Sequence, residues 1–277
     1  MKKNLTKIIE SRSIQTLEKF LLESNINETD KNGNNLLHLA VDIQDMNMVE
    51  FLISKGIDYN CVNNNGLTAL QISSMHDDLN ILKALLEVSK DTNLNLLHLS
   101  SASNMYNNVK YLLSIGYEVN KLDNYNSMPI HWAAQNGNLE IIELLCKYGA
   151  ALDVVDDEGQ SPLYIASGEN HITTVKFLIN QNVNIELNSG TPPLIIACAY
   201  SNYEIVKELL IAGANINCRD EDGRTPLFYA KLREDECLVN ILIDRDANIN
   251  IVDNYGISIL DLDKLEIRKK LYQELYE

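Results

Sequence analysis

The hexapeptide Thr225-Pro226-Leu227-Phe228-Tyr229-Ala230 is one of seven related phrases that return along the chain at nearly constant spacing. The fourth residues of these phrases are 38, 71, 98, 131, 164, 195 and 228, so the steps are 33, 27, 33, 33, 31 and 33 residues. A period in this range is typical of stacked supersecondary units, each of which contacts its neighbours along the chain. The question of function therefore moves from catalytic motifs to the surface that such a stack presents.

Each unit is predicted to hold two helices, a turn and an extended finger. Proline in the phrase, as at Pro226, suits the first residue of a helix, where no backbone N–H is needed, and Ser161 and Thr225 can cap the exposed N–H groups. Apolar residues at helical spacing, as in Ile141-Leu144-Leu145, predict a second helix with one buried face. Eighteen residues after the fourth position stand residues suited to a left-handed helix stop, namely Gly56, Gly116, Gly149, Asn182, Gly213 and Asp246.

The period and the phrase resemble the ankyrin repeat, whose pattern includes Thr-Pro-Leu-His-x-Ala. The stretch from Asp220 to Leu227 and the stretch from Met128 to Ala134 are close to that pattern, and the resemblance covers residues 30–263. It implies that the His of the phrase hydrogen-bonds backbone of the neighbouring finger. It also implies that partners dock on the finger tips and on the solvent side of the first helices.

We therefore expect an all-α ankyrin-repeat solenoid in one continuous elongated domain. A helical cap is predicted over residues 1–29, an array of about seven repeats over 30–263, and a C-terminal capping helix over 264–277. The 27-residue step loses six residues around Val88 to Asn93, where we expect the array to be weakest, and two more are lost between Asn182 and Gly190.

The net charge is −16, and residues 150–263 hold 19 Asp and Glu against 7 Lys and Arg, a net charge of −12. Phosphate binding needs a basic stripe, so nucleic acid is excluded as the expected partner. A protein with a basic surface is favoured, since opposite charges steer association. The alternative is that acidity only keeps the array soluble.

The expected location is the cytoplasm, and we expect a monomer when the protein is free. No stretch approaches the ~18 apolar residues of a membrane span, and the start Met1-Lys2-Lys3-Asn4 is not followed by the apolar region of a signal peptide. The five cysteines form no Cys-x-x-Cys pair, which is typical of reduced thiols. Secretion without an N-terminal signal peptide remains open.

The sequence predicts no catalytic, cofactor or metal site. His38, His98 and His131 recur in register, but stacked helices lie about 10 Å apart, too far for two such side chains to share a zinc ion at ~2.1 Å. Acidic clusters fall just before the glycine of a finger, where Asp favours a turn. Phosphate-binding glycine loops are absent from the sequence, and Trp132 is expected in the core.

Candidate protein-binding residues follow from the finger tips and from the solvent side of the first helices, in the units from Met128 onward. Among them, Tyr200, Leu232 and Tyr255 are expected to be exposed apolar anchors in an acidic field. The full set is Tyr125, Gln135, Asn136, Asp157, Glu158, Glu169, Tyr200, Glu221, Asp222, Arg224, Leu232, Arg233 and Tyr255.

Three hypotheses for function remain. The first is a non-catalytic protein-binding module that acts as an inhibitor, immunity protein or adaptor on a basic partner. The second is a secreted effector that engages host proteins through the same surface. The third is an enzyme with a cryptic site, for which the segments outside the repeats leave little room.

Overall fold

The computed structural model describes residues 5–89, 95–187 and 190–276. The described residues form helices joined by turns, with two isolated β-bridges between Val62 and Thr68 and between Val252 and Ser258. The all-α class predicted from the sequence is confirmed. Contacts divide the chain into two compact units, residues 1–119 and 120–277, whereas the sequence predicts one continuous domain.

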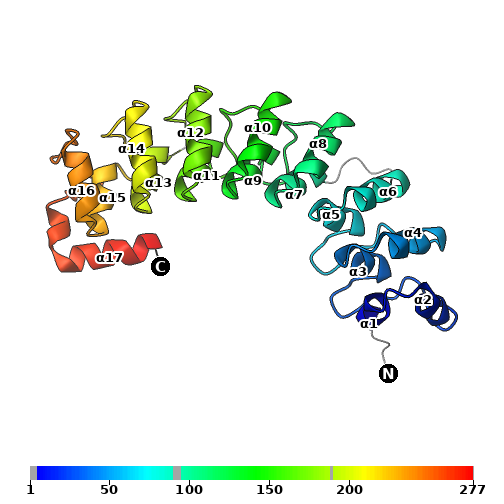
Figure 1. Ribbon diagram of the computed structural model, residues 1–277. Coiled ribbons are helices and arrows are strands. Elements are labelled where there is room, and N and C mark those ends of the chain that lie inside the picture. The colour runs from blue at the N-terminus through cyan, green and yellow to red at the C-terminus, as the bar shows by residue number, and fades with distance from the viewer. Residues whose placement is uncertain (1–4, 90–94, 188–189, 277) are drawn as a thin grey trace. The chain divides into compact units, whose positions relative to one another are not determined.

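Unit 1 is a stack of helix pairs (Figure 1). Its first helix of each pair packs on the next first helix, so that α3 contacts α1 and α5, and α5 contacts α7. The helices are α1 (Leu5–Glu10), α2 (Ile14–Leu21), α3 (Leu36–Asp42), α4 (Met46–Ser54), α5 (Ala69–Ser74), α6 (Leu79–Ser89), α7 (Leu96–Ala102) and α8 (Tyr106–Ser114).

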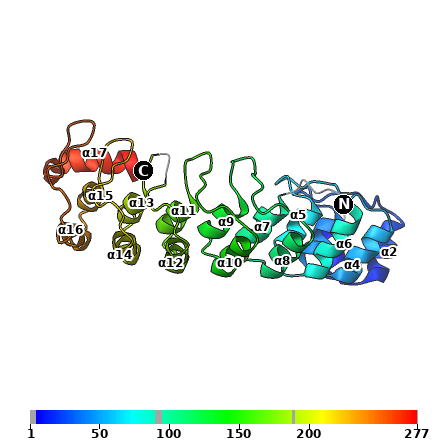
Figure 2. The ribbon, with the colours of Figure 1, turned by 90° about the horizontal axis from the view of Figure 1, so that it is seen from above.

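Unit 2 has two rows of helices. The inner row, α9, α11, α13 and α15, packs side by side, and the outer helices α10, α12 and α14 lie behind it (Figures 1 and 2). The helices are α9 (Pro129–Gln135), α10 (Leu139–Lys147), α11 (Pro162–Gly168), α12 (Ile172–Asn180), α13 (Pro193–Ala199), α14 (Tyr203–Ile211), α15 (Pro226–Leu232), α16 (Glu236–Ile243), the 3-10 turn η1 (Asp261–Asp263) and α17 (Leu265–Tyr276).

The local signals in the sequence produce the helix ends that they predict. Pro129, Pro162, Pro193 and Pro226 each occupy the first residue of an inner helix. The side chains of Ser161 and Thr225 accept hydrogen bonds from the N–H groups of Tyr164 and Phe228. The six predicted helix stops all have left-handed backbone, with φ from 59° at Asn182 to 95° at Gly213.

Apolar residues of both helix rows form the core, as the helical spacing requires. In unit 2, for example, Ile141 and Leu145 of α10 and Leu194 and Ala197 of α13 are completely or almost completely buried. Each buried Leu or Ile side chain stabilises the fold by about 1.5–3 kcal/mol relative to an exposed one. The inner row therefore stands on a continuous apolar layer and presents its other face to solvent.

Helices lie at both ends of the chain where the sequence predicts them. At the start, α1 packs on α3. At the other end, α17 packs on α15, and ion pairs join Lys231 to Asp263 at 3.1 Å and Arg268 to Glu234 at 2.5 Å. Within unit 2, α17 therefore packs on α15, which also contacts α13 and α16.

The predicted weak point around Val88 to Asn93 falls mainly on residues 90–94, which lie outside the described residues. The second shortening likewise includes residues 188–189, outside the described part of the chain. Both stay predictions.

Candidate protein-binding groove

Four fingers of unit 2 are held by an aspartate at their first position, namely Asp123, Asp156, Asp220 and Asp253. Asp156 Oδ1 accepts hydrogen bonds from the backbone N–H groups of Glu158 at 3.0 Å and Gln160 at 2.9 Å. Asp220 Oδ1 accepts one from the N–H of Arg224 at 2.8 Å. These acids therefore shape turns, as the sequence predicts, and part of the negative charge of unit 2 has a structural use.

Neighbouring fingers are tied by backbone hydrogen bonds. The N–H of Asp157 donates to the carbonyl of Tyr125 at 3.1 Å, and the N–H of Asn254 donates to that of Asp222 at 2.8 Å. At both places the bond fixes a finger tip against the neighbouring finger. Figure 2 shows the fingers of unit 2 along one edge of the inner helix row.

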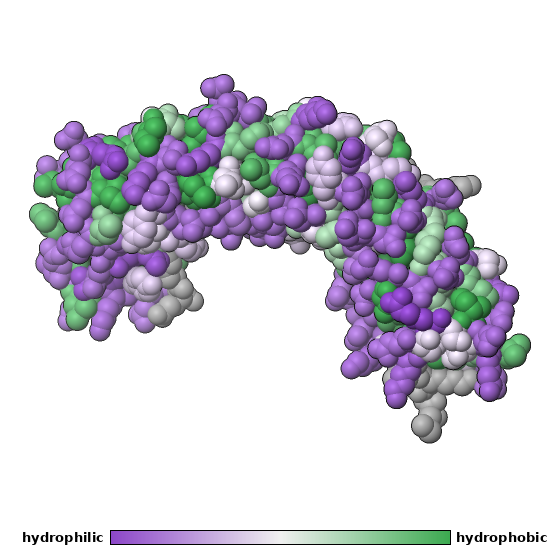
Figure 3. Space-filling model, in the orientation of Figure 1, coloured by the Kyte–Doolittle hydropathy of each residue, from purple (hydrophilic) through white to green (hydrophobic). Residues whose placement is uncertain are grey.

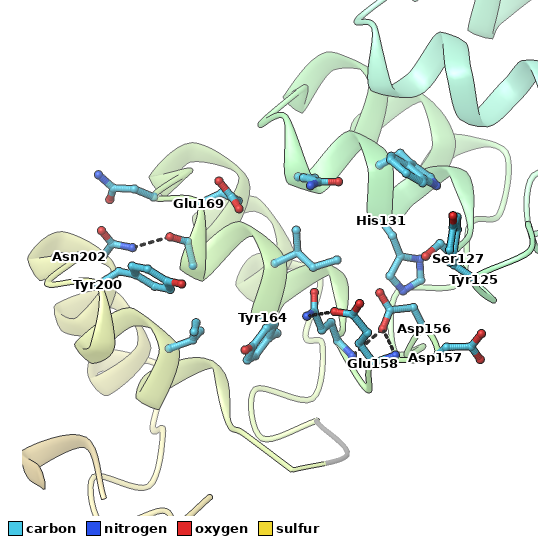
Figure 4. Close-up of a pocket in the computed structure, with 17 residues that line it drawn as sticks. Tyr125, Ser127, His131, Asp156, Asp157, Glu158, Tyr164, Glu169, Tyr200 and Asn202 are labelled. Carbon is cyan, nitrogen blue, oxygen red and sulfur yellow. Dashed lines mark hydrogen bonds between the residues drawn. The ribbon is translucent and has the colours of Figure 1, made fainter. Parts of the chain in front are cut away.

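A groove of about 710 Å³ runs between the fingers and the solvent face of α9, α11 and α13 in unit 2. It is lined by aromatic, carboxylate and amide side chains, and Figure 4 shows them as sticks. The lining residues are Tyr125, Ser127, His131, Trp132, Gln135, Asp156, Asp157, Glu158, Gln160, Tyr164, Ile165, Gly168, Glu169, Asn170, Ile196, Tyr200 and Asn202.

Four carboxylates line this groove, and none of its lining residues is Lys or Arg. Asp156, Asp157 and Glu158 lie together on one finger, and Glu169 lies farther along the groove, near Tyr200 (Figure 4). Figure 3 shows mostly hydrophilic residues on the inner-helix side of unit 2. The groove therefore carries a local excess of negative charge.

Aromatic side chains stand among these acids. Tyr125 and Tyr200 are 67% and 54% exposed, and Trp132 and Tyr164 are half-buried. The pKa of the Tyr164 hydroxyl is raised by burial and, to a smaller degree, by Tyr200, Glu158 and Asp156. These aromatics offer apolar area for a bound chain within an acidic field.

Two histidines of the phrases have structural roles. His38 Nε2 is 3.1 Å from the carbonyl oxygen of Leu67 in the next finger, which confirms the expected bond to a neighbouring finger. His131 Nδ1 accepts a hydrogen bond from the N–H of Met128 at 3.0 Å. Burial lowers the pKa of His131, although the nearby charge of Asp156 acts in the opposite direction.

The structure brings six of the thirteen predicted binding residues into the groove, namely Tyr125, Gln135, Asp157, Glu158, Glu169 and Tyr200. Asn136, Glu221 and Tyr255 are exposed outside it, and Asp222 and Arg233 are partly exposed. Glu221 lines a smaller hollow that also borders Glu158.

Two of the predicted residues are buried, which corrects the expectation that they face a partner. Leu232 is 1% exposed because α15 is packed on by α13, α16 and α17. Arg224 is 4% exposed, because its guanidinium packs over the rings of Phe228 and Tyr255 and pairs with Asp222.

Trp132 is not a core residue, contrary to the sequence prediction. It lies at the rim of the groove, and its Nε1 donates to Asp123 Oδ2 at 2.8 Å. Helical spacing could have found it, because Trp132 and the exposed Asn136 are four residues apart and share one face of α9. The same reasoning applies to Ile165 and Ile196, the equivalent residues of α11 and α13, which also line the groove.

The described residues contain no group of three or more His, Cys, Asp or Glu side chains placed to hold a metal ion. In the same part of the chain, every helix is too short or too polar to cross a membrane.

Comparison with known proteins gives the same family over nearly the whole chain. A family model described as ankyrin repeats (3 copies) matches residues 6–96, 97–191 and 194–262. A probable 26S proteasome regulatory subunit p28 of Saccharomyces cerevisiae is 30% identical over 133 residues, which cover 44% of this chain and 58% of the yeast protein.

Two further relatives are much longer than the region that they share with this chain. The human transient receptor potential cation channel subfamily A member 1 is 30% identical over 146 residues, 49% of this chain and 13% of the channel. A putative ankyrin repeat protein, FPV034, of fowlpox virus is 30% identical over 113 residues, 39% of this chain and 27% of the viral protein. Each match thus spans less than two thirds of the relative. Repeat spacing, helix architecture and the match to the family model together show that this chain belongs to the ankyrin repeat family.

Proposed function

We propose that this protein is a non-catalytic protein-binding module, and that the groove of unit 2 holds a segment of a partner protein with basic side chains. Ankyrin repeats are in general protein–protein interaction modules. The proposal rests on one observation: exposed aromatic rings and four carboxylates line the same groove. None of the residues that line this groove is Lys or Arg. An inhibitor, an immunity protein and an adaptor all act through such a surface.

Charge and aromatic area contribute to binding in different ways. Carboxylates at the rim steer a basic partner toward the groove and raise the association rate, an effect that salt screens. Aromatic side chains that become buried in the complex supply most of the affinity. Tyr200 and Tyr125 are the exposed rings that a bound segment would cover.

The arrangement of His131 favours binding over catalysis. Its Nδ1 accepts the hydrogen of the Met128 N–H, so the neutral ring carries its proton on Nε2. Neither nitrogen of that ring is then a free base for a nucleophile. The carboxylate Asp156 in turn holds the loop N–H groups of its finger.

Selection from a random peptide library tests the proposal directly. Peptides selected on the intact protein should be rich in Arg and Lys, and their binding should weaken as salt rises. Binding should also change the fluorescence of Trp132, because it is the single tryptophan of the chain and lines the groove.

Charge reversal in the groove provides the matched comparison. Glu158→Lys with Glu169→Lys should remove binding of the selected peptides. Glu140→Lys with Glu143→Lys makes the same change in net charge on α10, outside the groove, and should leave binding in place. Equal binding by both double variants would show that the groove is not the binding surface.

A further inference from the structure

The fifth finger (residues 156–160) and the seventh finger (residues 220–224) carry similar acid-rich sequences in the same register. The fifth reads Asp-Asp-Glu-Gly-Gln and the seventh reads Asp-Glu-Asp-Gly-Arg. Gln160 therefore stands where the seventh finger has Arg224. Four residues later, Tyr164 stands at the position of Phe228.

The seventh finger holds its own guanidinium group. Arg224 Nη1 pairs with Asp222 Oδ2 at 2.8 Å, and Arg224 Nε lies 3.7 Å from Asp253 Oδ2. The guanidinium carbon is 5.7 Å from the ring centre of Phe228 and 5.9 Å from that of Tyr255. This chain thus shows how an acidic finger beside aromatic rings accommodates an arginine side chain.

The fifth finger repeats one carboxylate and one ring of this site, Glu158 and Tyr164, but has no cation of its own. Gln160 Nε2 donates to Glu158 Oε2 at 2.8 Å. This bond is equivalent to the one from Arg224 to Asp222, but its donor is an uncharged amide. The ring of Tyr164 lines the groove next to Glu158 (Figure 4). The groove is open to solvent here, whereas the site of Arg224 is buried.

A second difference leaves one carboxylate oxygen of the fifth finger without a donor. Tyr229 donates its hydroxyl to Asp220 Oδ2 at 2.7 Å. The equivalent of Tyr229 after the fifth finger is Ile165, which has no polar group. No donor among the described residues reaches the matching Oδ2 of Asp156, a lining residue of the groove.

We propose that the groove takes an arginine side chain of the partner, with its guanidinium over Tyr164 and paired with Asp156 and Glu158. Two of these contacts repeat those of Arg224, which lies over Phe228 and pairs with Asp222 at the equivalent positions of the seventh finger. This inference rests on the proposed function and narrows it to one side chain. Arginine fits better than lysine because its planar group can stack on a ring and donate to two carboxylates at once. Lysine offers one compact, strongly hydrated charge.

Three short peptides test the inference without knowledge of the partner. They are acetyl-Gly-Ser-X-Ser-Gly-amide with X as arginine, lysine or citrulline, the uncharged analogue of arginine. The arginine peptide should bind with a dissociation constant on the order of 1 mM, as expected of a single anchor, and should bind about fivefold or more tightly than the lysine peptide. The citrulline peptide should not bind detectably. Trp132 fluorescence and isothermal titration both report the result.

The most direct test is a variant whose own side chain occupies the proposed arginine site. Gln160→Arg places a guanidinium beside Glu158 and Tyr164, so affinity for the arginine peptide should fall about tenfold or more, with the melting temperature unchanged or higher. Gln181→Arg is the matched control, because it makes the same substitution at the exposed end of α12, outside the groove, and it should retain binding. Asp156→Asn keeps the Oδ1 acceptor of the finger and loses the charge, so it should weaken binding about fivefold or more.

The outcomes separate this inference from the proposed function. If library peptides bind in the groove while arginine, lysine and citrulline peptides behave alike, or while Gln160→Arg binds as the unaltered protein does, the arginine site is refuted and the binding groove stands. Absence of saturable binding of the arginine peptide up to about 30 mM also refutes the site. If the library peptides ignore the charge reversal of Glu158 and Glu169, the groove itself is refuted.

Discussion

The fifth and seventh fingers show that similar acidic sequences can have different partners in the fold. At the seventh finger, Arg224 and Tyr229 neutralise or bind the acids, and the cluster is part of the fold. At the fifth, Gln160 and Ile165 leave the charge facing a groove. The count of acids in a segment therefore does not say how much charge faces solvent, because the fold supplies donors for some of them and not for others.

The largest expected effect is the loss of the internal guanidinium. Arg224→Gln makes the seventh finger resemble the fifth and leaves the buried carboxylate of Asp253 without its cation. Removal of one partner of a buried pair costs about 3–5 kcal/mol. Urea denaturation should show a loss of that order, while Gln160→Ala at the fifth finger should change stability by less than about 0.5 kcal/mol. Equal small losses would mean that the two fingers do not differ.

Tyr200 and Tyr255 should separate binding from stability. Tyr200→Ala removes an exposed ring of the groove and should speed dissociation of a bound peptide. The expected loss of binding free energy is about 2 kcal/mol, the size typical of a hot spot. The ring of Tyr255 instead covers Arg224, and its hydroxyl donates to Asp222 at 3.1 Å. Tyr255→Ala should therefore lower stability with little effect on dissociation. Stopped-flow dissociation and urea denaturation of both variants test the contrast. A Tyr255→Ala protein that kept its free energy of unfolding but released the peptide faster would contradict it.

Removal of one hydroxyl group tests how much the hydrogen bond to Asp220 stabilises the seventh finger. Tyr229→Phe leaves Asp220 Oδ2 without its donor in a mostly buried position, so stability should fall by about 1–3 kcal/mol. Tyr164→Phe removes a hydroxyl beside the fifth finger that lines the open groove and should be nearly neutral. Thermal unfolding of the two variants gives the comparison, and a larger loss for Tyr164→Phe would contradict it.

Rim charges should change the rate of association more than the lifetime of a complex. Asp157→Asn with Glu158→Gln should slow association and flatten its dependence on salt, because these carboxylates lie at the groove. Glu221→Gln, at the seventh finger, should have a smaller effect. Stopped-flow association across a salt series measures both, and equal effects would move the docking surface toward the seventh finger.

The smallest expected effect is a loss of stability at acidic pH. Burial lowers the pKa of His131 below the usual 6.5, so below about pH 6.5 the unfolded chain binds a proton that the folded chain does not. Stability should then fall as the pH drops from 7 through 6.5 until the folded His131 also protonates. The seventh repeat has Phe228 at this position and makes no such contribution. His131→Gln should reduce the loss between pH 7 and pH 5, and an unchanged pH profile would exclude His131 as its source.

Sequence reasoning found the family and most local features because they depend on neighbouring residues. Helix starts at proline, Ser and Thr caps and left-handed stops follow from backbone sterics and nearby hydrogen bonds. It missed Trp132 and misplaced Leu232 and Arg224, because their exposure depends on contacts with other segments. Arg224 is buried by Tyr255, 31 residues later in the chain, and Leu232 lies on the helix against which α17 packs.

The amino-acid sequence by itself determined the repeat, its helices, the acidic balance and the family, since all of these are written in local pattern and composition. Only the tertiary structure decided which acids face solvent with no donor and which are already paired. That distinction depends on side chains brought together from separate fingers and helices. Asp123 with Trp132, Asp220 with Tyr229 and Asp222 with Arg224 are satisfied, while Asp156 has a carboxylate oxygen open to the groove. The physical reason is that the electrostatic state of a carboxylate is set by the donors around it in space.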